Sequence, residues 1–97
     1  MTSPEVRQNY RLIHEASMAA RAKNMLSMWT IFDRPKDHPD GHIARCFLTG
    51  SGLLEPMPTT SAITGELETI RESMLLCGLY CLTRDPNDHP NVVETWL

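Results

Sequence analysis

Hydrophobic and polar residues near the amino terminus alternate with the period of an amphipathic helix. Ser3 suits the N-cap position and Pro4 the first helical position, where its missing N–H removes no hydrogen bond. The pattern predicts a helix over residues 4–25. Its apolar residues form two stripes, the first of Val6, Tyr10, Ile13 and Ala20 and the second of Leu12, Ala16, Ala19 and Leu26. Either one stripe faces the body of the protein and the other a partner, or both form one broad surface that faces the core.

The rest of the chain contains short runs rich in β-branched and aromatic residues, which are typical of strands. Four such runs predict strands near residues 28–33, 42–48, 79–83 and 91–97. A second helix is predicted over residues 65–76, with Thr64 as its N-cap and Gly78 at its end. Residues 49–63 are interrupted by glycine and proline, and we expect them to lie against the body with little regular structure.

The order helix, two strands, helix, two strands predicts an α+β fold in which two helices cover a small, mainly antiparallel sheet of about four strands. A chain of 97 residues is long enough for one domain with a modest core. We therefore expect a single domain over residues 1–97. Within it, an amino-terminal amphipathic helix (1–26) is appended to an α+β body (27–97).

Charge is divided unevenly between the two parts. Residues 1–25 carry a net charge of +2 and residues 26–97 a net charge of −5, which gives the −3 of the whole chain. Because an acidic body without a basic stripe is a poor ligand for phosphate backbones, we do not expect nucleic acid as a partner. No apolar run approaches the ~20 residues of a membrane span, and the first residues lack the pattern of a secretory signal. We expect a cytoplasmic protein with no membrane association.

The sequence contains no recognisable catalytic motif. Cys46, Cys77 and Cys81 cannot all pair within one chain, and we expect them to be reduced. The spacing of Cys77 and Cys81 is too wide for the usual two-residue zinc motif. Neither a Gly-x-Ser-x-Gly nucleophile nor a glycine-rich phosphate loop occurs. We therefore expect no catalytic residue, no cofactor and no enzymatic activity.

Two segments of the chain have similar sequences. Asp-His-Pro occurs at residues 37–39 and again at residues 88–90, each time followed by Asp or Asn and placed between predicted strands. Since Asp, Asn and Pro all favour turns, two hairpin turns account for most of this composition. Imidazoles and carboxylates also bind metals or serve as acid–base pairs. The candidates for such a site are His38, Asp40, His42 and His89.

Sheet topology decides whether these candidates meet. If the second and third predicted strands are antiparallel, the two loops lie at the same end of the sheet, and if they are parallel, the loops lie at opposite ends. The sequence leaves both arrangements open.

The segment Met-Trp-Thr-Ile-Phe-Asp-Arg-Pro-Lys-Asp-His-Pro-Asp at residues 28–40, Ala44-Arg45 downstream and Val-Glu-Thr-Trp-Leu at residues 93–97 resemble a group of small uncharacterised bacterial proteins. The resemblance covers about residues 26–97 and leaves out the basic helix. It implies a compact bacterial domain and transfers no functional residue.

These observations favour a non-enzymatic regulatory protein that binds another protein or itself through the first helix and an adjoining sheet surface. The residues expected to make the contact are Tyr10, Leu12, Ile13, Ala16 and Ala19. One concrete form is an inhibitor of a host protein, of the phage or mobile-element type. The alternative is a metal-binding or metal-assisted hydrolytic protein that uses the two Asp-His-Pro loops.

Overall fold

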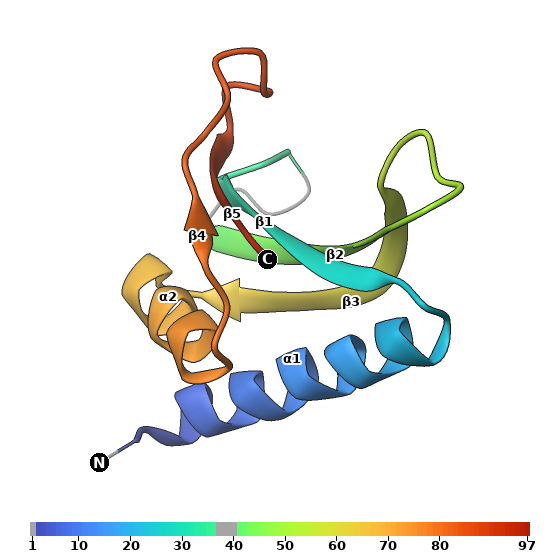
Figure 1. The fold of residues 1–97 in the computed structure, drawn as a ribbon. Helices are drawn as coiled ribbons and strands as arrows, with labels where there is room; N and C mark the ends of the chain where they lie inside the picture. Colours follow the sequence, from blue (N-terminus) through green and yellow to red (C-terminus); the bar gives the residue numbers. More distant parts are fainter. Residues whose placement is uncertain (1, 37–40) are drawn as a thin grey trace.

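The computed structural model describes residues 2–36 and 41–97, which form two helices and a five-stranded antiparallel sheet (Figure 1). The elements follow one another as α1 (Pro4–Ala22), β1 (Leu26–Asp33), β2 (His42–Thr49), β3 (Met57–Gly65), α2 (Leu67–Leu76), β4 (Cys81–Leu82) and β5 (Val92–Trp96). The strands lie in the sheet in the order β3-β2-β1-β5-β4. Every neighbouring pair is antiparallel. The prediction of an α+β fold is confirmed.

The prediction of about four strands, in the order helix, two strands, helix, two strands, missed β3. This strand lies mostly within residues 49–63, for which little regular structure was expected. It pairs with β2 in a register that places Ile63 opposite Ala44 and Ala62 opposite Arg45. The β-branched Thr and Ile residues between positions 59 and 64 favour a strand, and Pro58 is tolerated because β3 lies at the edge of the sheet. The prediction for residues 79–83 was too long, since β4 contains only two residues.

The first helix begins where the sequence predicts. The Ser3 hydroxyl oxygen accepts a hydrogen bond from the Val6 amide at 3.2 Å, and this satisfies one of the unpaired donors of the first turn. The helix ends a few residues before the predicted boundary. Asn24 adopts a φ of 57°, which lets the Met25 amide donate to the Ala20 carbonyl at 2.9 Å and closes the helix.

The second helix ends as predicted but begins differently. Gly78 has a φ of 77°, which suits glycine, and the following Leu79 amide donates to the Met74 carbonyl at 3.1 Å. The predicted N-cap was wrong. Thr64 belongs to β3, and Glu66 occupies the cap position without a side-chain hydrogen bond to the helix. The strand continues through Thr64 because its backbone pairs with Ile43.

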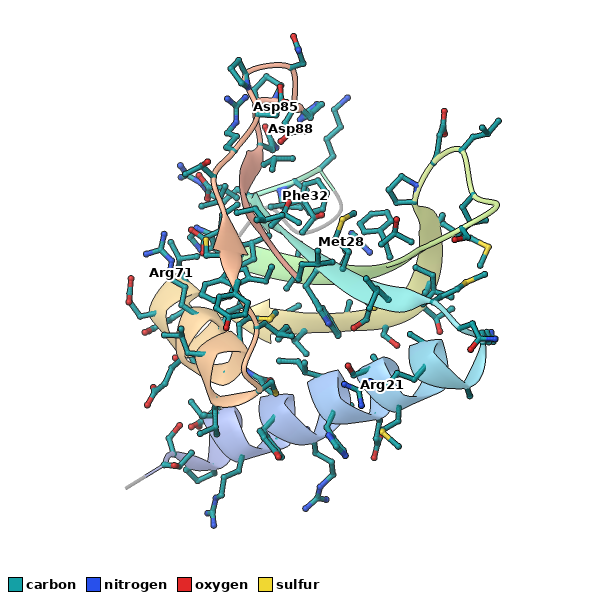
Figure 2. All side chains as sticks on the ribbon, viewed as in Figure 1. Arg21, Met28, Phe32, Arg71, Asp85 and Asp88 are labelled. Carbon is teal, nitrogen blue, oxygen red and sulfur yellow. The ribbon has the colours of Figure 1, made fainter. Side chains whose placement is uncertain are left out.

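The core lies between the two helices and one face of the sheet. Ile13 of α1 is 0% exposed and packs into the same cluster as Trp29 of β1. The other members of this cluster come from β1, β2, β3, α2 and β5: Ile31, Ala44, Cys46, Ile63, Ile70, Met74 and Trp96. The first helix therefore supplies part of the core. Met28 and Phe32 lie on the side of the sheet away from α1 and are half-buried (Figure 2).

A buried polar contact also joins the two helices. The Asn9 side-chain amide donates to the Ser73 hydroxyl at 3.2 Å, and that hydroxyl donates to the Thr69 carbonyl at 2.7 Å. Both side chains are thus satisfied although they are buried. This contact fixes α1 against α2 at a defined position along both helices.

Candidate functional site

The loops that contain the two Asp-His-Pro segments begin and end at the same end of the sheet. Asp33, the last residue of β1, donates its amide to the Asn91 carbonyl at 2.7 Å. The Asn91 side-chain amide donates to the Arg34 carbonyl at 3.3 Å. These two contacts join the β1–β2 connection to the β4–β5 connection. Of the two topologies left open by the sequence, the structure has the antiparallel one.

The candidate metal ligands are only partly described. His38 and Asp40 lie outside the described residues. The imidazole of His42 lies 3.5 Å from the Asp33 carboxylate, measured from Nε2 to Oδ1. Nδ1 of His89 accepts a hydrogen bond from the Asn91 amide at 3.2 Å, which is a local turn contact. Within residues 2–36 and 41–97, no three His, Cys, Asp or Glu side chains are grouped so that they could hold a metal ion.

The three cysteine thiols differ in exposure, but the surroundings of each raise its pKa. Burial raises the pKa of Cys46 and of Cys77 above the ordinary value of a thiol. Loss of solvent contact, followed by the nearby Glu94 carboxylate, raises the pKa of Cys81 as well. Since the thiolate is the reactive form, these environments oppose its formation. The arrangement does not activate a cysteine nucleophile.

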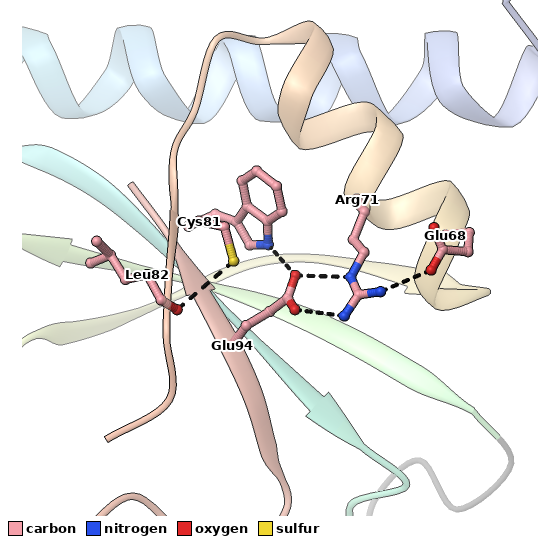
Figure 3. Close-up of polar contacts among 6 residues, drawn as sticks. Glu68, Arg71, Cys81, Leu82 and Glu94 are labelled. Carbon is pink, nitrogen blue, oxygen red and sulfur yellow. Dashed lines mark hydrogen bonds and ion pairs between the residues drawn. The ribbon is translucent and has the colours of Figure 1, made fainter. Parts of the chain in front are cut away.

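A charged cluster joins α2 to β5 on the covered face of the sheet (Figure 3). The Arg71 guanidinium donates to both carboxylate oxygens of Glu94, from Nε at 3.1 Å and from Nη2 at 2.7 Å. The Trp96 indole N–H donates to the same carboxylate at 2.7 Å, and Arg71 reaches Glu68 at 2.8 Å. The hydrogen bond from Arg71 holds the pKa of Glu94 below its ordinary value. Both charged partners are satisfied, so this cluster serves the structure.

The residues predicted for protein binding lie on different sides of α1. Ile13 is fully buried in the core, and Ala16 is half-buried against it. Ala19 is exposed. Tyr10 is 39% exposed on the side of α1 that faces the end of α2, where its ring stacks on His14. Leu12 is 40% exposed on the opposite side, which faces β3.

A groove runs between α1 and β3, which we call the α1–β3 groove. Two adjoining hollows that share Leu12 and Ala62 form it. Residues 60–65 of β3 line one side, and α1 lines the other with the second apolar stripe at Leu12 and Ala16. The sequence predicted this stripe but not the strand beside it.

The outer edge of β3 carries no partner strand within the described part of the chain. The strand is nine residues long, contains no charged residue and is mostly exposed. Edge strands of natural proteins are usually short, charged, bent or covered, because an open edge pairs with other chains. Of these features β3 has only a bend, at its register shift against β2, and it is neither short nor charged. An uncharged β-branched run after Pro58 was the signal in the sequence that could have revealed this edge.

No known protein family, curated protein or solved structure matches the chain. Neither helix of the described residues has the length and apolar character needed to cross a membrane.

Proposed function

We propose that this protein acts by binding another protein through the α1–β3 groove and that it is not an enzyme. The observation that carries the proposal is the open outer edge of β3 beside the exposed apolar side chain of Leu12. A strand edge offers unpaired backbone donors and acceptors, and the neighbouring stripe offers apolar surface. Together these are the two components of strand addition, a common mode of peptide recognition.

The chemistry of the thiols supports a non-enzymatic role. Their raised pKa values disfavour the thiolate that nucleophilic catalysis requires. All three cysteines are free, which suits a reducing compartment, and we accordingly place the binding in the cytoplasm.

The test uses the full chain as bait in an extract of the source organism. Leu12→Gln replaces the apolar side chain in the groove with a polar one that is well tolerated in helices. Met18→Gln is the matched control, because Met18 is a 52% exposed apolar residue of α1 that does not line the groove. We expect one or more proteins to be retained by the wild type and by Met18→Gln and to be lost with Leu12→Gln. Equal retention by all three proteins would mean that the groove is not the binding surface.

A further inference from the structure

We infer that the partner of the α1–β3 groove is an extended segment rich in lysine or arginine, which adds to the outer edge of β3 as a further strand. This inference rests on the proposed function and specifies the chemistry of the partner.

The regular part of β3 is where such a segment would pair. The β2–β3 register shifts between Arg45 and Phe47, which bends β3 around residues 59–61. Within this bend the Thr59 hydroxyl donates to the Cys46 carbonyl at 2.9 Å and accepts from the Ser61 amide at 3.1 Å. The Ser61 amide at the bend is thus already engaged. Beyond it, residues 62–65 pair regularly with β2, so alternate amides and carbonyls point outward from the sheet.

The first helix lies along the same stretch. Leu12 and Ala62 line both hollows of the groove, and Ala16 extends its apolar surface. Alternate side chains of an added strand point to the same face of the sheet. On the helix side they would meet Leu12 and Ala16, which favours small or branched apolar residues at every second position of the partner.

The charge of the groove favours a basic segment over a second copy of this chain as its partner. Glu5 and Glu15 of α1 and Glu66 after β3 line it, and no basic side chain is among its described lining residues. A second copy of this chain would bring the same three carboxylates against them, because a symmetric dimer places identical surfaces in contact. Like charges across an interface oppose association, whereas lysine or arginine would be attracted. The groove is therefore complementary to a basic strand rather than to itself.

The probe is a displayed library of short random linear peptides, selected on the full-length protein. Enriched peptides are synthesised and titrated against the wild type and two double variants. The first, Glu5→Gln with Glu15→Gln, removes charge from the groove. The second, Glu55→Gln with Glu72→Gln, removes the same charge from exposed positions outside it. Amide hydrogen exchange then locates the bound peptide.

We expect enriched peptides that alternate branched apolar residues with an excess of lysine or arginine, and that slow exchange at residues 62–65. Removing the groove charge should weaken their binding roughly three- to tenfold, and the control should leave it unchanged. Peptides that bind the groove without basic residues would overturn the inferred chemistry and leave the proposed function standing. Peptides that bind elsewhere, or a selection without enrichment, would overturn strand addition. The groove as a binding surface would be overturned only if the Leu12→Gln comparison fails as well.

Discussion

Glu94 shows how a single residue can link two layers of this fold. Glu94 is 7% exposed on β5, and its carboxylate receives two hydrogen bonds from Arg71 of α2 and one from the Trp96 indole. A buried carboxylate is costly unless it is paired and hydrogen-bonded, and here both conditions are met. The sequence does not show that Arg71 is a partner, because 23 positions separate it from Glu94 and only the packing of α2 against the sheet brings the two together.

Replacing Glu94 with glutamine should lower the free energy of unfolding at pH 7 by about 1–3 kcal/mol, the usual worth of hydrogen bonds to a charged group. Because Arg71 lowers the pKa of Glu94 in the folded protein, the stabilisation is present above the unfolded value near 4.3 and is lost as the pH falls through the folded value. Urea unfolding from pH 7 to pH 3 measures both effects.

The wild type should lose more stability than Glu94→Gln over this acid range. Glu72→Gln, at an exposed carboxylate of α2, is the control and should behave like the wild type. Identical acid profiles for the wild type and Glu94→Gln would show that the ion pair does not contribute.

At the N-terminal cap of α1, Ser3→Ala should cost about 1 kcal/mol, because the Val6 amide loses its acceptor. Chemical denaturation of the two proteins measures the difference. Thr2→Ala is a neighbouring change that leaves the cap in place and should stay close to the wild type. A Ser3→Ala protein as stable as the wild type would show that the cap bond contributes nothing in solution.

The elements differ in how much of them the sequence determines. The start of α1 was predictable because a local cap specifies it, and the end of α2 because Gly78 provides the positive φ. The strand β3 was missed because the glycines and prolines before residue 59 suggested a loop, and this outweighed the β-branched residues that follow Pro58. The groove depends on that strand, so half of it was missed. Its other half, the stripe at Leu12 and Ala16, follows from helical spacing alone.

The first helix is expected to be required for folding as well as for binding. Ile13→Ala should destabilise the protein by about 2–5 kcal/mol, because it leaves a cavity beside Trp29 in the core. Met18→Ala, at an exposed position of the same helix, should change stability by less than about 0.5 kcal/mol. Thermal or urea unfolding of the two variants compares them directly. Equal, small effects would mean that α1 is only loosely attached.

On the scale of the whole molecule, the main feature of the described residues is a sheet whose long open edge at β3 lies beside a groove lined by acidic side chains. An uncharged, open edge strand is a template for pairing with other chains, including copies of itself. The carboxylates of Glu5, Glu15 and Glu66 supply repulsion between copies that the strand itself lacks. Under the proposal above, this repulsion favours a different chain over a second copy, and self-association stays a prediction that sedimentation tests.

Removing this repulsion should make the protein associate with itself. The variant that combines Glu5→Gln and Glu15→Gln is expected to show concentration-dependent dimers in sedimentation velocity at neutral pH, whereas the wild type remains a monomer. The variant with Glu55→Gln and Glu72→Gln should match the wild type. A wild type that is dimeric at low concentration would show that the edge charge does not prevent self-association.

Strand addition at β3 is tested by amide hydrogen exchange in the full chain, first free and then bound to a protein captured through the groove. An open edge predicts fast exchange in the free protein at those amides of residues 62–65 that point outward from the sheet. The amides that hydrogen-bond between β3 and β2 should stay protected. The captured protein should slow the outward amides specifically. Uniform protection of β3 in the free chain, or no change on binding, would show that no strand adds to this edge.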